Sequence, residues 1–107
     1  MATNQNTVDF IIEQMASSGN AIRSRKMFGE YAIYCDDKVI AFVCDNTLFV
    51  KIIPTSTRLI ENKVEGQAYP GSKPYYVIDE ETIENADFMA KLSQAMADEL
   101  PPPKRKK

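Results

Sequence analysis

The chain has 107 residues and a mass of 12.1 kDa, enough for one domain with a single core. Its hydrophobic fraction of 44% and charged fraction of 26% are ordinary for a globular protein, and no apolar run approaches the roughly 20 residues that span a bilayer. The sequence contains no histidine, which excludes histidine-based catalytic triads and most zinc sites.

The charges are distributed unevenly. Residues 101–107 are three prolines followed by four cations, so we expect a disordered basic tail after a folded domain of residues 1–100. Without that tail, 9 basic residues face 15 acidic ones, a net charge of −6. A pI of 5.1 is low for a dedicated nucleic-acid-binding domain, although the tail cations are candidate contacts for a polyanion. These cations are Lys104, Arg105, Lys106 and Lys107.

The first predicted elements are a helix and a basic strand. Thr7 is a suitable N-cap, apolar residues follow at helical spacing, and Gly19 is placed to end a helix over residues 8–18. The polar residues before it contain no secretory signal, so we expect a cytoplasmic protein. Residues 22–27 then form a short strand that carries a compact basic cluster, Arg23, Arg25 and Lys26.

The basic cluster has two interpretations. As edge-strand charges, the three cations keep the sheet from pairing with other chains. As a site, they bind a phosphate or an acidic protein.

Three further strands follow, over residues 30–36, 39–44 and 47–53. Gly29 marks a bend before the first of them. Turns at residues 37–38 and 45–46 contain Asp and Asn, which tolerate the left-handed backbone that two-residue hairpins require. In the first hairpin this register pairs Cys35 with Ile40 and Ile33 with Phe42. In the second it pairs Val43 with Leu48 and Ala41 with Val50.

Because side chains alternate along a strand, this register sorts them onto two faces. The face expected to meet the helices holds Ala32, Tyr34, Val39, Ala41, Val43, Leu48, Val50 and Ile52. The second face is also mostly apolar, so either a homodimer or protein partner covers it, or one helix lies on each side of the sheet. The candidate interface residues on the second face are Tyr31, Ile33, Ile40, Phe42 and Phe49.

The remaining elements complete an α+β fold. A short helix is expected over residues 54–63, a Gly- and Pro-rich loop over 66–74, and a last strand over 75–79. Asn85 is a suitable N-cap for a final helix, which three prolines stop. The sequence therefore predicts a two-layer domain with an antiparallel sheet of about five strands, in the order α-β-β-β-β-α-β-α.

The residues offer little reaction chemistry. In the predicted register Cys35 and Cys44 are about 13 Å apart, too far for a disulfide, so we expect two buried thiols. The acidic clusters lack metal-site spacing, and glycine is too sparse for a phosphate loop. We expect no enzyme activity, catalytic residue, cofactor or metal. The loop segment carries three tyrosines, Tyr69, Tyr75 and Tyr76. They could form a platform on which a base or peptide stacks, or line a small-molecule pocket. The structural alternative is that they pack in the core and order the loop.

Three segments resemble the TfoX/Sxy family N-terminal domain. The motif Arg-x-Met-Phe-Gly of that family is similar to Arg25, Met27, Phe28 and Gly29, with Tyr34 downstream. Residues 42–51 resemble its second hairpin. Its Pro-Tyr-Tyr element is similar to Pro74, Tyr75 and Tyr76. The sequence departs from the family at Glu30 and Ala32, where glycine is frequent, so the bend after Phe28 depends on Gly29.

The resemblance implies a single-domain form of a family that includes competence and transcription regulators. We therefore expect a non-enzymatic regulatory domain that acts through protein contacts. One alternative is a nucleic-acid-binding accessory domain that uses the basic cluster and the tail. Another is a small-molecule sensor with a pocket beneath the tyrosine-bearing loop.

Overall fold

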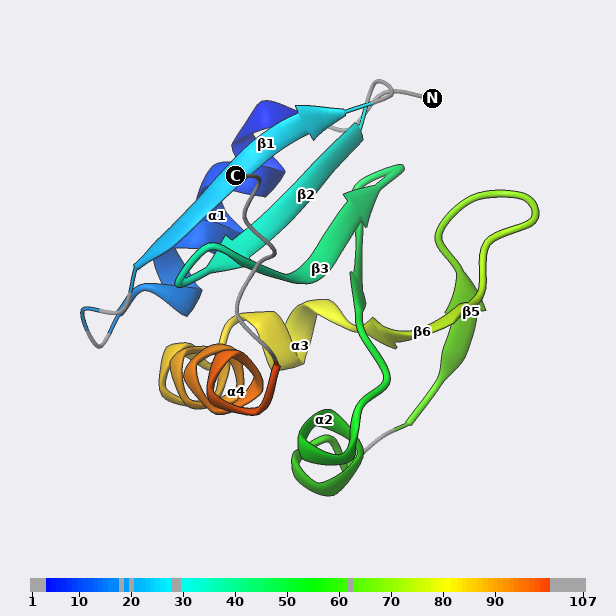
Figure 1. Ribbon diagram of the computed structural model, residues 1–107. Helices are drawn as coiled ribbons and strands as arrows, with labels where there is room; N and C mark the ends of the chain where they lie inside the picture. Colours follow the sequence, from blue (N-terminus) through cyan, green and yellow to red (C-terminus); the bar gives the residue numbers. More distant parts are fainter. Residues whose placement is uncertain (1–3, 18, 20, 28–29, 62, 101–107) are drawn as a thin grey trace, which may run out of the picture.

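The computed structural model describes residues 4–17, 19, 21–27, 30–61 and 63–100. These residues form one antiparallel sheet of six strands, with the helices gathered on one side of it (Figure 1). The strand order is β1-β2-β3-β4-β6-β5. The elements are α1 (Gln5–Met15), β1 (Ile22–Met27), β2 (Glu30–Cys35), β3 (Lys38–Cys44), β4 (Thr47–Val50), α2 (Pro54–Leu59), β5 (Glu65–Gln67), β6 (Pro74–Ile78), α3 (Glu80–Ile83) and α4 (Ala86–Glu99).

The predicted α+β class is confirmed, with two additional short elements. β5 has three residues, overlaps the start of the segment expected to be a loop, and pairs with β6. α3 has four residues and precedes α4, with Asp79 as its N-cap. None of the helices in the described ranges is long and apolar enough to cross a membrane.

Two helix starts were predicted from N-caps, and one was right. Asn85 caps α4, because its side chain accepts a hydrogen bond from the backbone N–H of Phe88. The cap of α1 is Asn4 and not Thr7: the Asn4 side chain accepts from the backbone N–H of Asn6. The helix therefore begins at Gln5, three residues earlier than expected.

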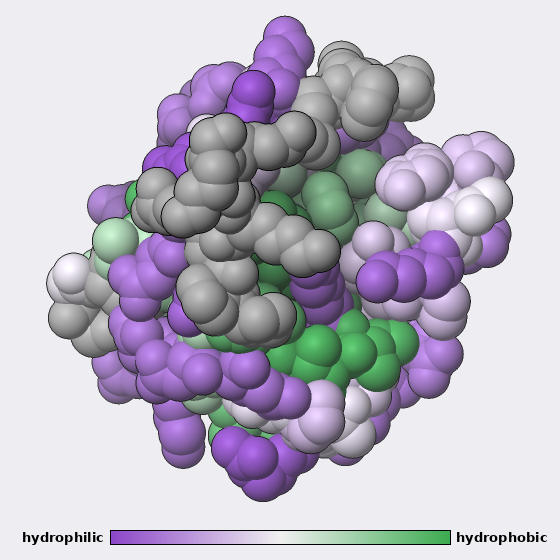
Figure 2. All heavy atoms as spheres, in the orientation of Figure 1, coloured by the Kyte–Doolittle hydropathy of each residue, from purple (hydrophilic) through white to green (hydrophobic). Residues whose placement is uncertain are grey.

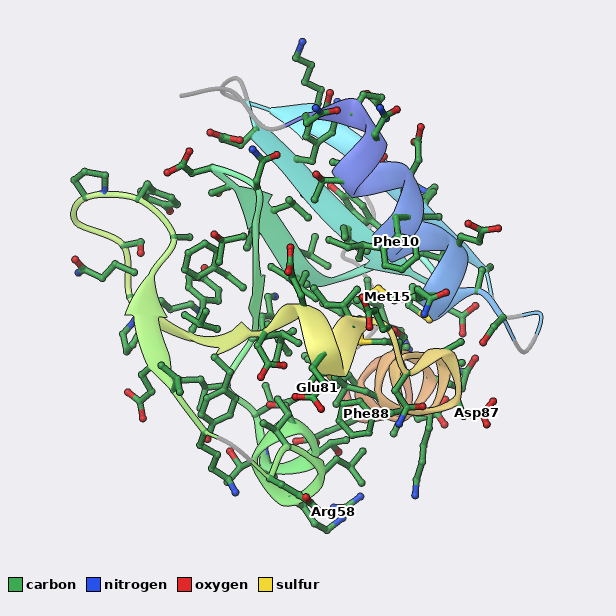
Figure 3. All side chains as sticks on the ribbon, turned by 180° about the vertical axis from the view of Figure 1, so that it is seen from behind. Phe10, Met15, Arg58, Glu81, Asp87 and Phe88 are labelled. Atoms are coloured by element: carbon green, nitrogen blue, oxygen red, sulfur yellow. The ribbon has the colours of Figure 1, made fainter. Side chains whose placement is uncertain are left out.

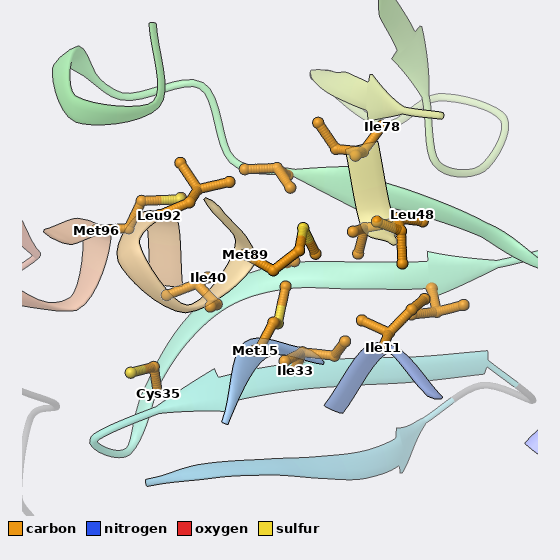
Figure 4. Packing of buried hydrophobic residues seen from close by; sticks show 14 of the residues in the cluster. Ile11, Met15, Ile33, Cys35, Ile40, Leu48, Ile78, Met89, Leu92 and Met96 are labelled. Atoms are coloured by element: carbon orange, nitrogen blue, oxygen red, sulfur yellow. The ribbon is translucent and has the colours of Figure 1, made fainter. Parts of the chain in front are cut away.

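The core lies between the sheet and the helices α1 and α4 (Figure 4). Ile11 and Met15 of α1 are one helical turn apart, so both point to the sheet. Met89 and Leu92 of α4 follow the same rule. Burial of such side chains contributes about 1.5–3 kcal/mol each, which fixes the helices on this face. Viewed from behind, α1 lies in front of the first strands of the sheet, and α4 is seen nearly end-on below α1 and beside α3 (Figure 3).

The predicted register of the first hairpin is wrong by two residues beside the turn and by one residue beyond a bulge. The two-residue turn is Asp36-Asp37, with φ angles of 53° and 66°, and not residues 37–38. Cys35 therefore pairs with Lys38, and a bulge in β3 then places Ile33 opposite Ala41. Because side chains alternate with a period of two, the one-residue offset beyond the bulge exchanges the two predicted faces of β2.

The exchange corrects the predicted interface. Tyr31, Ile33 and Ile40 are exposed by only 9%, 0% and 1% and belong to the core beneath the helices, so they are not a free surface. Phe42 and Phe49 do lie on the opposite face. The bulge explains why Ile40, expected on the outer face, enters the core beside Ala41.

The second hairpin follows its predicted register. Asp45 and Asn46 form the turn with φ angles of 52° and 59°. Val43 pairs with Leu48 and Ala41 with Val50, as expected. β6 then pairs with β4, which joins the C-terminal half of the chain to the hairpins.

Candidate partner-binding surface

The helices leave one face of the sheet without a helix over it, and we call this the open face. α1, α3 and α4 lie on the other side, and α2 packs against α4, so the predicted alternative with one helix on each side is wrong. The printed registers place side chains from five strands on the open face. They are Arg23, Arg25, Glu30, Ala32, Tyr34, Phe42, Cys44, Phe49, Lys51, Tyr75 and Val77.

The centre of the open face is a packed aromatic cluster. Cys44, Phe49 and Tyr75 are exposed by only 6%, 8% and 4% and pack together, with Phe42 and Val77 partly buried against them. The rings of Phe42 and Tyr75 meet edge to face at 79°, with centroids 5.5 Å apart. In this arrangement the electropositive edge of one ring lies against the electronegative face of the other, which is favourable. Much of the apolar surface on this face, which was expected to need a partner to cover it, is therefore buried by contacts within the aromatic cluster itself.

Cations flank this cluster on the β1 side. The Arg23 guanidinium lies 4.4 Å from the centroid of the Tyr34 ring. Its Nη2 atom is 3.1 Å from the Asp37 carboxylate, but the two side chains are 54% and 64% exposed. Exposed pairs of this kind contribute about 0–1 kcal/mol. Arg25 lies two residues further along the same face and is exposed.

Two more cations flank the cluster on the β4 and β6 side. Continuing the printed register by one residue places Lys51 opposite Tyr75. Burial, and then the nearby charge of Lys73, lower the pKa of Lys51. Among the described residues neither lysine forms an ion pair, so their repulsion is not offset by a neighbouring carboxylate.

The charges of the molecule are segregated between its two sides. The helices α1, α3 and α4 with their caps contain nine of the 15 acidic residues and one basic residue, Lys91. Among the described residues, the open face carries the cations Arg23, Arg25 and Lys51 and one carboxylate, Glu30. Its charged side chains are therefore mainly basic, although the domain is acidic overall. Such a local field favours an anionic partner. The nine acidic residues are Asp9, Glu13, Asp79, Glu80, Glu81, Glu84, Asp87, Asp98 and Glu99.

Exposed apolar side chains occur near the same surface. Figure 2 shows a hydrophobic area over the segment that connects β4 to α2, where Ile52 is 37% exposed. Tyr69, in the loop between β5 and β6, is 56% exposed. The open face therefore has a polar, cationic rim together with some accessible apolar surface.

The structure separates residues that the sequence grouped. Lys26 pairs with Tyr31, a core residue, so it points to the opposite side of β1 from Arg23 and Arg25. The tail cations lie outside the described residues. Sequence reasoning missed Lys51 and Lys73, because only the β4–β6 pairing brings these two lysines together.

The three tyrosines do not form a common platform. Tyr75 packs on the open face, whereas Tyr76 belongs to the core, and its hydroxyl lies 2.8 Å from Oγ1 of Thr57. Two described cavities, of about 290 and 480 Å³, are not lined by the tyrosine-bearing loop. The smaller is at the start of β1, and the larger lies between α1, the β3–β4 turn and α3, beside the exposed Phe10.

The two cysteines are buried on opposite faces of the sheet and are not joined by a disulfide. Cys35 belongs to the main core and Cys44 to the aromatic cluster, which agrees with the predicted absence of a disulfide. Burial, and secondarily the Glu30 carboxylate, raise the pKa of Cys44, so its thiol is a poor nucleophile. Within the described ranges no group of three or more acidic or cysteine side chains is placed to hold a metal ion.

Several residues of the family-like motif gather on the open face. Arg25, Tyr34 and Tyr75 reach it from three different strands. Phe28 and Gly29 lie outside the described residues. The TfoX N-terminal domain model matches residues 13–99, which includes all of these positions. The chain belongs to the TfoX N-terminal domain family.

This membership confirms the resemblance noted in the motif. A relative from Spirochaeta aurantia, described as the "uncharacterized 12.7 kDa protein in trpE 5′ region", is 38% identical over 107 residues. The match covers 100% of this chain and 91% of that protein. The sequence similarity therefore extends over most of a second small protein.

Proposed function

We propose that this TfoX N-terminal domain is a non-enzymatic regulatory domain that binds a protein partner on its open face and thereby influences transcription, including that of competence genes. The observation that carries the proposal is the position of the cations. Arg23, Arg25, Lys51 and Lys73 surround the one sheet face that the described helices leave uncovered, in a domain of net negative charge.

A protein partner explains this surface better than a nucleic acid does. Single-stranded nucleic acids bind by stacking bases on accessible aromatic rings. Here Phe49 and Tyr75 are 8% and 4% exposed, Phe42 is held edge to face with Tyr75, and Arg23 lies over Tyr34. These rings are engaged with one another or with Arg23, so the cations are the main polar groups that the open face offers a partner.

A homodimer through the open face is disfavoured by its charge. A two-fold axis brings the same patch of both copies together. Four cations would then face four others, which is unfavourable. Light scattering tests this point: we expect a mass near 12.1 kDa at micromolar concentration, and a mass twice as large would favour a homodimer.

The function itself is tested by charge reversal in the cell that carries the gene. Transcripts are compared after deletion and after complementation with the wild-type gene or with Arg25→Glu/Lys51→Glu. The matched control is Arg58→Glu/Lys91→Glu, which reverses two exposed charges on the helical side. We expect the open-face variant to behave like the deletion and the control to restore expression. Full restoration by a folded open-face variant, or a deletion without transcriptional effect, would overturn the proposal.

A further inference from the structure

We infer that the partner contributes an acidic segment that adds as a seventh, antiparallel strand along the outer edge of β1. This inference rests on the proposed function and specifies the chemistry of the partner. It combines the outer backbone edge of β1, with which no described strand pairs, with the cations that the same strand carries.

The backbone of β1 is suited to strand addition. All six of its residues pair with β2 without a bulge, and β1 is the terminal strand of the sheet. The strand contains no proline and is about 20 Å long. An antiparallel edge strand directs alternate N–H and C=O groups outward, where an extended peptide can complete the ladder.

The charges of β1 specify which peptide can bind. Arg23 and Arg25 point to the open face, and Lys26 points to the other side. A strand paired with β1 thus needs acidic residues opposite these three positions. The residues opposite Arg23 and Arg25 are two apart, so the partner carries an acidic-x-acidic pattern on one face.

The ion pair that Arg23 already forms with Asp37 does not prevent the binding of an acidic strand. Asp37 lies in the exposed β2–β3 turn, and its ion pair with Arg23 is largely solvated. Solvated pairs exchange partners at little cost. Arg25 and Lys26 are exposed, and among the described residues neither forms an ion pair.

A second copy of this chain does not fit the edge. Antiparallel pairing of β1 with β1 of another copy, centred on Ser24, would place Arg23 opposite the Arg25 position and Arg25 opposite the Arg23 position, and like charges opposite one another destabilise a sheet. The cations thus act against self-association and select an acidic strand. A nucleic acid would use the charges but not the backbone edge.

The test is an NMR titration of the ¹⁵N-labelled protein with a synthetic peptide, acetyl-Thr-Glu-Glu-Val-Glu-Val-Thr-amide. Antiparallel to β1, its three glutamates lie opposite Lys26, Arg25 and Arg23. We expect shift changes and slowed amide exchange across Ile22–Met27. Replacing each glutamate by lysine should weaken binding by about twofold to fivefold per charge pair.

Two matched controls separate strand addition from general attraction. The same peptide with N-methylated alternate amides keeps its charge but cannot complete the ladder, and it should not bind. The Arg25→Glu variant should bind the acidic peptide more weakly than the wild type does. The same variant should bind more tightly to a peptide that carries lysine opposite position 25. Lys91→Glu, on the helical side, should leave the affinity unchanged.

Specific outcomes overturn the inference. No shifts in β1 with the acidic peptide, or equal binding of the N-methylated peptide, rules out strand addition. Amide shift changes with an oligothymidylate but not with the peptide would favour a nucleic acid as the partner. Slower amide exchange in β1 at higher protein concentration, without any peptide, would favour a second copy. If none of the peptides binds but Arg25→Glu/Lys51→Glu still abolishes regulation in the cell, the proposed function stands and the added strand does not.

Discussion

The rings of Phe42 and Tyr75 meet edge to face, with centroids 5.5 Å apart, although β4 lies between the strands that carry them. The two side chains therefore lean toward each other above β4 and help to cover Phe49. This contact gives the open face a small core of its own. It also explains why a sheet with helices on one side only can carry so many apolar residues on the other.

A double-mutant cycle should detect this contact. We expect Phe42→Leu and Tyr75→Leu to be coupled by about 0.5–1.5 kcal/mol, the range measured for aromatic pairs beyond their burial. Urea unfolding of the wild type, both single variants and the double variant gives the coupling. Phe10→Leu, on an exposed position of α1, is the control partner for Phe42→Leu, and these two effects should add within about 0.5 kcal/mol.

The hydroxyl of Tyr76 is expected to stabilise the attachment of α2. It lies 2.8 Å from Oγ1 of Thr57, within hydrogen-bond distance. Tyr76→Phe should cost about 0.5–1 kcal/mol of unfolding free energy, the lower part of the usual range because the exposed Thr57 hydroxyl can bind water instead. Thr57→Val added to Tyr76→Phe should cost little more. Additive losses would show that the two groups act independently.

The turn between β2 and β3 offers a test of backbone strain. Asp37 has a φ of 66°, in the left-handed region that side chains with a Cβ atom disfavour. Asp37→Gly and Asp37→Ala both remove the carboxylate that pairs with Arg23, so they differ chiefly in the Cβ atom. We expect the glycine variant to be more stable than the alanine variant by about 1–2 kcal/mol. Equal thermal and urea midpoints would contradict this explanation of the turn.

The sequence predicted the second hairpin because it contains one plausible turn, Asp45-Asn46. The first hairpin was different, since residues 36–38 offer two overlapping two-residue turns with similar chemistry. A shift of one residue exchanges the faces of a strand, so the error moved Ile33 and Tyr31 from the core to a supposed interface. Local residue preferences could not reveal the compensating bulge, which depends on packing under the helices.

The candidate surface was only partly predictable for a related reason. Arg23 and Arg25 were visible because they are neighbours in the sequence. Lys51 and Lys73 are 22 residues apart, and their proximity depends on the pairing of β4 with β6, a non-local contact. β5 and α3 were missed because elements of three and four residues have too little sequence to show a periodic pattern.

Lys51 should make the domain less stable than a neutral residue in its place. Burial and the charge of Lys73 lower the pKa of Lys51, which means that the folded state disfavours its charged form. Lys51→Met keeps the side-chain stem and removes the charge. We therefore expect a higher urea midpoint at pH 7, with a gain of up to about 0.5 kcal/mol in the free energy of unfolding. The increase should become smaller, but not vanish, when Lys73 is already replaced by methionine, because burial is the larger cause of the lowered pKa of Lys51. A lower midpoint for Lys51→Met would contradict the repulsion.

The Cys44 thiol should give the domain an alkaline limit. Burial, and secondarily the Glu30 carboxylate, raise the pKa of Cys44 above the 9.0 of an unperturbed thiol, so the folded protein keeps this proton to higher pH than the unfolded chain does. Its stabilising contribution is complete below pH 9.0 and is lost as the pH rises through the folded pKa. The stability difference between wild type and Cys44→Ala should therefore shrink above that pH.

Tyr75, whose pKa is also raised by burial, acts in the same direction and is present in both proteins. Because the Cys44 charge contributes to the raised pKa of Tyr75, the comparison reports the thiol together with its effect on Tyr75. The rate of iodoacetamide labelling of Cys44 checks the result independently. Glu30→Gln removes the secondary cause, so labelling at pH 8 should become faster, while Cys35 in the main core stays unreactive. Faster labelling of native Cys44 than of the urea-unfolded chain would contradict a raised pKa, because thiolate is the reacting form.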